Sequence, residues 1–512
     1  MATPKAFLFT TGDGRPTANA FWMGEHKKII PRVEAALASK GFEVVWGHAK
    51  DVAIDSPYMA AEVAKKFLPE VHQGDLLIDL TTGWNFPEHF GVVVTTLQGF
   101  IRQGKLRLLL VCNMKEKAPG YVAARANALI CEIMELPYTC LTVIDQSDAG
   151  WQGFDDSLAA VINGTYKPEV PESEIEVTAE DRKIAAAAIR QIQQSGGVVP
   201  LINASSMTMA QGWPHYPMFK KLGLTPIFIG SNQFRADMNA VQNCDLQWAF
   251  DWLRDHGLQF VFEEGGLCEK EVFDALRMYF AKLGYFRQGA IGMGTQGQMD
   301  TTRFEVATDL SESMMMSTLS PGKDRPVVDV TEADCEALWT SILMQYILRE
   351  MKGHFPPIGF HDVRHYNMRQ DTLVLLNSGA LALDFMGDAP GDFSDIRAVS
   401  QNRSVYFLNG GACVMGNMRP FQRASMFRAH GRGMGYRMLA TRLSFQPLNW
   451  ELRAKEYGEL DPWPMGIVQV PGGKTKAVTL NWIPNHSHHC NADILAPMKA
   501  ASELLGVPFY CF

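Results

Sequence analysis

Short apolar segments and longer amphipathic segments alternate through the first 150 residues, and this alternation limits the possible folds more than any other feature. Apolar runs of strand length occupy residues 6–11, 42–47, 75–83, 106–113 and 137–145. Segments with helical periodicity lie between them, at residues 26–41, 60–74, 90–104 and 123–136, and several end in glycine, as helix C-termini often do. Strands that alternate with helices predict βαβ units and a parallel sheet.

A polar, acidic stretch at residues 163–181 interrupts the alternation and indicates a domain boundary. A second α/β set follows, with a helix at 179–194, strands at 197–205, 226–230, 258–264 and 326–330, and a closing helix at 332–353. Strands then dominate, at 371–379, 404–411 and 477–482, until a last helix at 494–506. We therefore expect an α/β protein with two Rossmann-like parallel-sheet domains, at residues 1–170 and 171–353, followed by a β-rich C-terminal domain at residues 354–512.

Composition and charge disfavour several classes of protein. No apolar run reaches the about 18 residues that a membrane span requires, and the amino terminus lacks the long apolar region of a secretory signal. The formal net charge of −8 disfavours nucleic acid as a partner. The nine cysteines form no CxxC pair, which suits reduced thiols. We expect a cytoplasmic protein with no membrane and no nucleic-acid partner.

The segment "GMGTQG" at residues 292–297 matches the GxGxxG pattern of dinucleotide-binding sites. Such a site needs a full strand before the turn and a helix after it. Only a short apolar run precedes this segment, and the residues after it are poor helix formers. A tight glycine loop is therefore the preferred interpretation.

Three other segments carry residues suited to a metal site. "VVDVTEAD" at 327–334 passes from a strand into a helix and places Glu332 at or near the first helical turn, where acidic residues are common for capping alone. "GFHDVRHY" at 359–366 places Asp362 among basic residues, where an ion-paired turn residue is the ordinary interpretation. "NWIPNHSHHCNADI" at 481–494 holds three histidines after a predicted strand.

The three histidines cannot all face one point. His486 and His488 share a face if the segment is extended, and His486 and His489 share one if it is helical. The spacing matches no standard zinc signature, so one histidine acting with distant ligands is favoured. A Glu, an Asp and a His each lie just past a predicted strand end, where α/β proteins usually build sites. Two carboxylates and one imidazole suit Mn²⁺ or Mg²⁺.

Five segments in order resemble motifs of the L-fucose isomerase family, which interconverts aldoses and ketoses. The matching segments are "GTQGQ" (294–298), "VVDVTEAD", "FHDVRHY", "LNSGALALD" (376–384) and "NWIPNHSHHCNAD". Three earlier segments, "DGR" (13–15), "LIDLTTGW" (77–84) and "INASSMTMAQ" (202–211), resemble the family more loosely. One departure is that the family has a substrate-contacting tyrosine after a Gly-Gly pair, whereas this chain has Ala412.

The resemblance implies a set of site residues. The metal ligands of the family correspond to Glu332, Asp362 and His486, and the implied ion is Mn²⁺, with Mg²⁺ or another divalent cation as alternatives. The implied substrate-binding residues are Gln296, Arg15, Trp84, Trp463 and Asn481. The resemblance also implies a homo-oligomer, a hexamer or an assembly of trimers, in which Trp84 reaches the site of a neighbouring subunit.

The implied function is aldose–ketose isomerisation of an open-chain sugar, resembling L-fucose or D-arabinose or carrying an anionic group, through an enediolate. Glu332 and Asp362 are then both metal ligands and the catalytic groups that move the proton between C2 and C1. The six arginines within residues 418–442 fit either a surface or a pocket for an anionic sugar. Two alternatives are a sugar-binding protein of tandem α/β domains and a metal-dependent lyase or epimerase.

Overall fold

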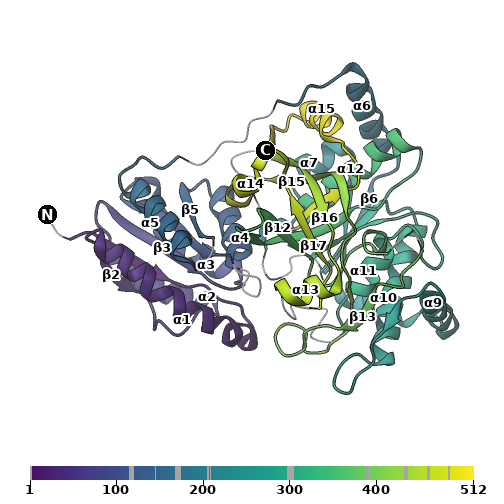
Figure 1. The fold of residues 1–512 in the computed structure, drawn as a ribbon, viewed down its shortest axis with the longest axis horizontal. Coiled ribbons are helices and arrows are strands. Elements are labelled where there is room, and N and C mark those ends of the chain that lie inside the picture. The colour runs from purple at the N-terminus through teal and green to yellow at the C-terminus, as the bar shows by residue number, and fades with distance from the viewer. Residues whose placement is uncertain are drawn as a thin grey trace.

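The computed structural model describes most of the chain in one connected arrangement (Figure 1). The described residues are 3–114, 120–144, 146–167, 174–203, 207, 209–296, 305–387, 389, 391–431, 436–457, 462–482 and 485–512. The protein is α/β, with two parallel sheets followed by a mixed, β-rich sheet in the C-terminal region. None of the helices in these ranges combines the length and the apolar character needed to cross a bilayer.

The first sheet contains the five parallel strands that the alternation predicts. In spatial order they are β2 (Glu43–Trp46), β1 (Lys5–Phe9), β3 (Asp75–Thr81), β4 (Leu106–Asn113) and β5 (Tyr138–Val143). Every residue of β3 is buried, because helices cover both faces of the sheet. The strand order reverses between β1 and β3, and ligand sites of doubly wound sheets lie outside such a reversal.

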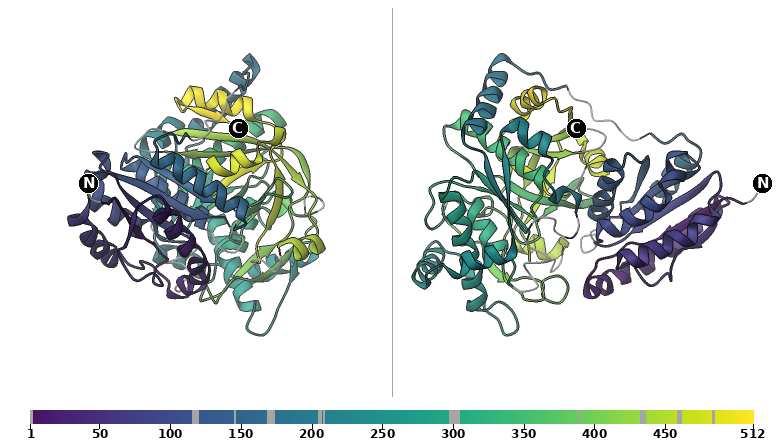
Figure 2. Two further views of the ribbon diagram at one scale, coloured as in Figure 1. Left: turned by 60° about the vertical axis from the view of Figure 1, so that its left-hand side comes forward. Right: turned by 180° about the vertical axis from the view of Figure 1, so that it is seen from behind.

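Two groups of helices cover the two faces of this sheet (Figure 2). One face packs against α1 (Pro16–Ser39) and α5 (Asp148–Ile162). The other packs against α2 (Pro57–Phe67), α3 (Pro87–Arg102) and α4 (Gly120–Ile133). Helix α1 begins ten residues before the predicted segment at 26–41, because Pro16 is well suited to the first position of a helix. Helix α5 was absent from the predicted elements.

The second sheet is also parallel, and its order is β10 (Val328–Thr331), β9 (Gly292–Thr295), β6 (Val198–Ile202) and β7 (Thr225–Ile229). The predicted glycine loop is therefore wrong for residues 292–295, which form the buried strand β9. The glycines allow close packing instead. A Cβ atom on Gly292 would lie 2.9 Å from Ile342, and one on Gly294 would lie 2.9 Å from the Cα atom of Ala333.

In the described part of the chain, seven helices accompany the second sheet: α6 (Ala179–Gln194), α7 (Tyr216–Leu222), α8 (Ser231–Asn239), α9 (Asn243–Asp255), α10 (Glu269–Arg287), α11 (Asp309–Met316) and α12 (Cys335–Lys352). Helix α6 has the predicted bounds, and Thr178 and Asp181 form a capping box at its start. Helix α12 begins later than predicted. Glu332 lies just before its N-cap, Asp334, so it is near the first turn, as predicted, but is not part of the helix.

A small sheet joins the second and third parts of the chain. Residues 258–264 were predicted to belong to the second parallel sheet, but only β8 (Gln259–Phe260) forms there. It pairs with β13 (Arg397–Ser400), which pairs in turn with β14 (Ala412–Met415). The second and third predicted domains are thus connected by shared strands as well as by an apolar core that runs through both.

The C-terminal region is built on a sheet of seven strands. Their order is β15 (Phe421–His430), β18 (Ser487–Cys490), β11 (Gly359–Asn367), β12 (Thr372–Leu376), β17 (Met465–Gln469), β16 (Arg437–Gln446) and β19 (Phe509–Cys511). An additional pairing of β15 with β16 closes six of the strands into a ring. Helices α13 (Trp450–Tyr457), α14 (Thr475–Asn481) and α15 (Leu495–Leu505) complete the region.

Two predicted strands of this region are wrong. Residues 477–482 belong largely to helix α14, which buries Val478 against the core. A short apolar run does not distinguish a strand from a buried helix. Residues 404–411 form turns, in which Gly410 and Gly411 adopt positive φ angles of 69° and 123°.

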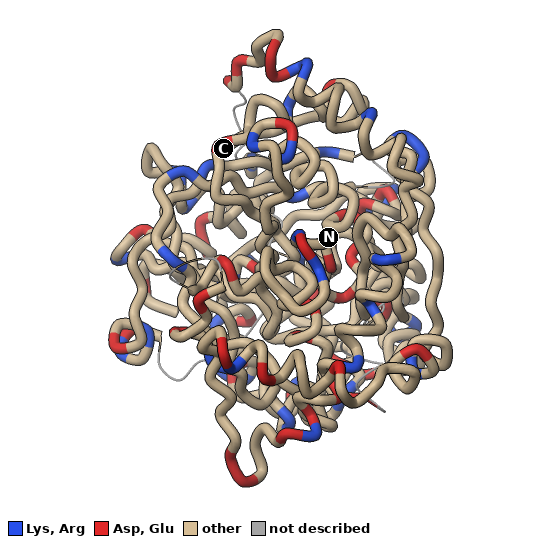
Figure 3. Tube along the Cα trace, turned by 90° about the vertical axis from the view of Figure 1, so that its right-hand side faces the viewer, with Lys and Arg blue, Asp and Glu red and all other residues tan. Residues whose placement is uncertain are grey.

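Acidic and basic positions are intermixed along the described chain (Figure 3).

Candidate functional site

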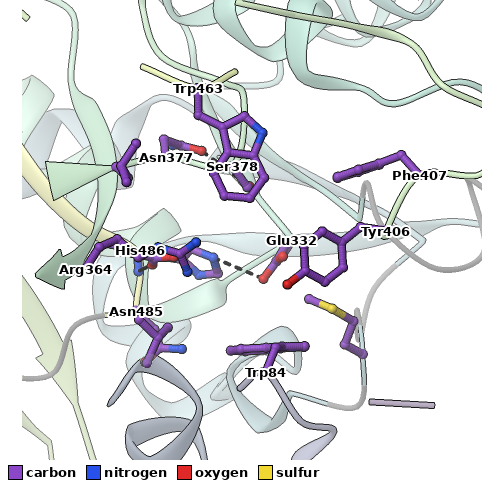
Figure 4. Close-up of a pocket in the computed structure, with 14 residues that line it drawn as sticks. Trp84, Glu332, Arg364, Asn377, Ser378, Tyr406, Phe407, Trp463, Asn485 and His486 are labelled. Atoms are coloured by element: carbon purple, nitrogen blue, oxygen red, sulfur yellow. Dashed lines mark hydrogen bonds and ion pairs between the residues drawn. The ribbon is translucent and has the colours of Figure 1, made fainter. Parts of the chain in front are cut away.

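One pocket brings together residues from all three parts of the chain (Figure 4). It lies between the first sheet with its helices and the remainder of the molecule. The lining residues are Trp84, Val122, Met207, Glu332, Asp362, Arg364, Leu376, Asn377, Ser378, Tyr406, Phe407, Trp463, Asn485 and His486. Five of the eight residues proposed from the sequence are among them: Trp84, Glu332, Asp362, Trp463 and His486.

Glu332 reaches the pocket from a tight turn between β10 and α12. Glu332 and Ala333 both have left-handed backbone conformations, with φ angles of 61° and 53°. The turn is possible because Gly294 on the neighbouring strand β9 leaves space for the backbone of Ala333. The carboxylate of Glu332 is buried, with 6% of its side chain exposed.

Asp362 lies within strand β11 rather than past the end of a strand, so that part of the prediction is wrong. It is paired with Leu376 of β12. Its Oδ1 atom accepts a hydrogen bond of 3.0 Å from the backbone N–H of His486. The two residues are therefore adjacent at the wall of the pocket, although they are distant along the chain.

His486 precedes strand β18 and also has a left-handed backbone, with φ 48°. It follows helix α14, not the strand that was predicted before it. Its Nε2 atom lies 3.1 Å from Oε2 of Glu332, and its Nδ1 atom lies 2.9 Å from Oδ2 of Asp334. Burial favours the neutral imidazole, but the two carboxylates outweigh it and raise the pKa of His486 to about 10.

Asp334 completes the arrangement behind His486. It is fully buried, and its Oδ2 atom also lies 2.9 Å from a guanidinium nitrogen of Arg428 on β15. Burial would raise the pKa of this carboxyl group, but Arg428 and His486 outweigh that effect and lower it. The sequence interpretation missed Asp334, which resembles an ordinary N-cap and does accept the N–H of Ala337.

The remaining histidines of the cluster point elsewhere. His489 stacks on His361 with ring centroids 4.8 Å apart, and burial lowers the pKa of His489 to about 3. His488 lies opposite Phe360 in the register of β18 with β11, and its side chain is on the other face of β18 from that of His489. Burial lowers the pKa of His488 to about 3 as well. Of the three, His486 alone lines the pocket, in keeping with the interpretation that one histidine acts with distant residues.

Two tryptophans form walls of the pocket. Trp84 follows β3 and lines the pocket of its own chain, whereas the resemblance implies that it reaches a neighbouring subunit. Trp463 precedes β17, and its indole N–H donates a 2.8 Å hydrogen bond to Oε1 of Gln401. The guanidinium of Arg364 lies 5.5 Å from the centre of the Trp463 ring.

The other three proposed residues are not among those lining the pocket. Arg15 forms an ion pair of 2.6 Å with Asp13, and its guanidinium lies 5.0 Å from the ring centre of Tyr406. Gln296 directly follows β9 and is buried, and its backbone N–H donates to the carbonyl of Ile202. The amide of Asn481 donates to the carbonyl of Ala477 within α14.

Several lining residues were not proposed from the sequence. Arg364, Asn377, Ser378 and Asn485 lie inside the motifs that carry the resemblance, so the motifs contained a signal for them. Tyr406 and Phe407 come from the stretch that was predicted as a strand and had no such signal. Tyr406 directs its phenol group into the pocket, on the side of Glu332 and Trp84 (Figure 4).

The arginine-rich stretch contributes no described residue to the pocket lining. Four of its arginines bind groups of the protein itself. Three form ion pairs, Arg428 with Asp334, Arg437 with Glu132 and Arg442 with Asp493, and Arg419 donates a hydrogen bond to a backbone carbonyl. Arg423 is exposed, and Arg432 lies outside the described residues. Within the described lining, the arginine that faces the pocket is Arg364.

The donor types at the pocket fit a divalent cation, but the donors are not arranged as a ready-made centre. Among the described residues, no three His, Cys, Asp or Glu side chains form a group placed to hold a metal ion. His486 and Glu332 instead contact each other directly. Two carboxylates and an imidazole still face one pocket, and this set of donors suits Mn²⁺ or Mg²⁺.

Comparison with known proteins does not assign the chain to a family. No protein-family model matches it, and neither does any curated protein.

Proposed function

We propose that this protein is a metal-dependent aldose–ketose isomerase that acts on an open-chain sugar. One observation carries the proposal: Glu332, Asp362 and His486, which come from three separate segments, line a single pocket. The motifs that contain these three residues are a property of the sequence alone, so their meeting in one pocket is an independent observation. A divalent cation held by them would supply a Lewis acid for the sugar carbonyl and for the enediolate oxygens.

The chain's own carboxylates have the chemistry that the proton transfer requires. In an aldose, one carboxylate takes the proton from C2 and a proton is returned at C1, while the hydroxyl proton of O2 passes to O1; the product is the ketose and the protein ends unchanged. Glu332 and Asp362 both line the pocket and are candidates for this base and acid. His486 holds Asp362 through its backbone N–H and faces Glu332 through its ring.

The walls of the pocket suit a small polyhydroxylated molecule. Trp84, Trp463 and Phe407 provide flat apolar surfaces against which C–H groups can pack, and they exclude water. Asn377, Ser378 and Asn485 provide amide and hydroxyl groups that can bind the hydroxyls of a sugar. Arg364 adds a positive charge, which would suit a sugar with an anionic group.

A metal-reconstitution assay tests the proposal. The full-length protein is treated with a chelator, dialysed, and incubated with panels of aldoses and ketoses, with and without Mn²⁺, while products are followed by NMR. The proposal predicts ketose formed from an aldose only when Mn²⁺ is present. Sugar binding that survives the chelator without turnover would indicate the sugar-binding alternative. An epimer or a cleaved product would indicate an epimerase or a lyase.

A further inference from the structure

Asp334 joins the start of helix α12 to the candidate site. Its Oδ1 atom accepts the backbone N–H of Ala337 at 2.9 Å, which caps the helix. Its Oδ2 atom lies 2.9 Å from Nδ1 of His486 and 2.9 Å from Arg428. The carboxylate is fully buried, so these bonds are not exchanged with water.

The contact with Asp334 determines which nitrogen of His486 faces the pocket. A carboxylate only accepts hydrogen bonds, so Nδ1 of His486 must donate to Asp334, and in this structure Nε2 likewise donates to Glu332. The Nε2 atom is then the nitrogen left to face Glu332, from which it lies 3.1 Å away. A carboxylate bonded to the far nitrogen of a histidine fixes the tautomer and the orientation of the ring at metal sites in general.

Arg428 and the helix hold the carboxylate itself in place. Arg428 lies on β15 and is 1% exposed, so its charge is compensated inside the protein by Asp334. The peptide N–H of Ala337 fixes the second oxygen. Asp334 therefore has three partners from three elements, while its own side chain does not line the pocket.

We infer that Asp334 is the positioning residue of the proposed metal centre, and that it aims Nε2 of His486 at the pocket. The inference rests on the proposed function, since it assigns how one of the proposed ligands is held. It also gives the arginine-rich stretch a role, because Arg428 supplies the counter-charge that anchors Asp334.

The test measures Mn²⁺ binding to chelator-treated, full-length protein by calorimetry. In Asp334→Asn the amide keeps the size and the helix cap but loses the charge facing His486 and Arg428. We expect affinity for Mn²⁺ to fall by about 10- to 100-fold, the loss typical when such an outer partner is removed. Isomerase turnover should recover partly when Mn²⁺ is raised, because the catalytic carboxylates are unchanged.

The chain offers a matched control outside the pocket lining. Glu132 is equally buried, and it lies 2.9 Å from His430 and 2.7 Å from Arg437. Glu132→Gln removes a buried carboxylate with the same kinds of partner, so it should lower thermal stability and leave Mn²⁺ affinity near that of the wild type. Equal weakening by Glu132→Gln and Asp334→Asn would mean that general loss of packing explains both, and it would overturn the inference.

A double variant keeps the test valid if Asp334→Asn alone does not fold. Asp334→Asn combined with Arg428→Met leaves no buried charge unpaired at this position. This double variant should fold and still bind Mn²⁺ weakly. Wild-type affinity in a folded Asp334→Asn or double variant overturns the inference and leaves the proposed function standing. A wild-type protein that binds no Mn²⁺ overturns both.

Discussion

The Nε2 atom of His486 lies 3.1 Å from Oε2 of Glu332, and both residues have left-handed backbone conformations, with φ 48° and 61°. Residues other than glycine rarely adopt this conformation, which costs about 1–3 kcal/mol and persists only where the surrounding structure imposes it. The fold therefore holds both side chains at the pocket against the local preference of the backbone. Such strain is concentrated at functional sites, which supports a role for this pair.

Replacing either pocket carboxylate should remove the proposed isomerase activity. Glu332→Gln and Asp362→Asn keep the size of each side chain but cannot accept a proton from carbon. We expect turnover with saturating Mn²⁺ to fall by about 10²- to 10⁴-fold, the range for loss of a general base. Asp493→Asn is the control, because Asp493 forms a partly exposed ion pair of 3.0 Å with Arg442 and does not line the pocket. Wild-type turnover in both pocket variants would contradict the assignment.

The phenol of Tyr406 should contribute to substrate recognition. The phenol points into the pocket, and the guanidinium of Arg15 packs against the ring, 5.0 Å from its centre. Tyr406→Phe keeps the ring and removes one hydrogen-bonding group. We expect a loss of about tenfold in kcat/KM, which corresponds to about 1.4 kcal/mol, within the range for one hydrogen bond. Tyr58→Phe, at a position that is 85% exposed, should change nothing. An unchanged kcat/KM in Tyr406→Phe would contradict a contact with substrate.

The parts of the structure that the sequence predicts best are those in which local pattern and tertiary fold agree. Strands β1, β3 and β4 of the first sheet lie between helices and are almost wholly buried, so each reads as a largely apolar run. Helix α14 shows the opposite case. Its apolar residues form too short a run to distinguish a helix from a strand, and its position depends on packing, including the hydroxyl of Tyr121, which donates to the carbonyl of Thr479.

The same distinction, between residues marked by a local pattern and residues placed by distant packing, applies to the site. Glu332, Asp362 and His486 stand in motifs, and sequence comparison by motif selects them. Asp334 looks like an ordinary N-cap in sequence, because its partners His486 and Arg428 are distant along the chain. Tyr406 has no local signal either, because its ring packs against Arg15, which precedes helix α1 and is distant along the chain. Residues whose roles depend on such distant partners become visible only in three dimensions.

Gly294 should be required for the turn that carries Glu332. A Cβ atom at this position would lie 2.9 Å from the Cα atom of Ala333, which is backbone and cannot rotate away. Gly294→Ala should therefore destabilise the protein by about 1–3 kcal/mol, as overpacking does, and lower turnover by displacing Glu332. Gly99→Ala is the control: Gly99 lies within helix α3, where an added Cβ meets nothing within 4 Å. That variant should gain about 0.5–1 kcal/mol. Urea unfolding and activity assays on both variants test this, and unchanged turnover in Gly294→Ala would contradict it.

Asp79 should make the stability of the protein depend on pH. Burial raises the pKa of its carboxyl group to about 6, although hydrogen bonds from Asn127, Thr81 and Thr11 partly oppose the rise. The unfolded chain has a pKa of about 3.9 for this residue, so the folded state binds the proton more tightly. Its contribution to stability is then fully present below about pH 4 and is lost as the pH rises through 6.

The variant Asp79→Asn cannot lose this proton and should escape that loss. Relative to that of the wild type, its free energy of unfolding should become larger, meaning a more stable fold, by up to about 3 kcal/mol between pH 4 and pH 7, since one pKa unit corresponds to about 1.4 kcal/mol. Urea unfolding of both proteins at pH 4.5 and pH 7.5 measures the change. The amide oxygen can still accept from Thr11, but the amide NH₂ cannot accept from Asn127. That loss is the same at both pH values, so the change with pH isolates the charge. A difference that stays constant with pH, or that favours the wild type as the pH rises, would show that the buried carboxyl group does not titrate in this range.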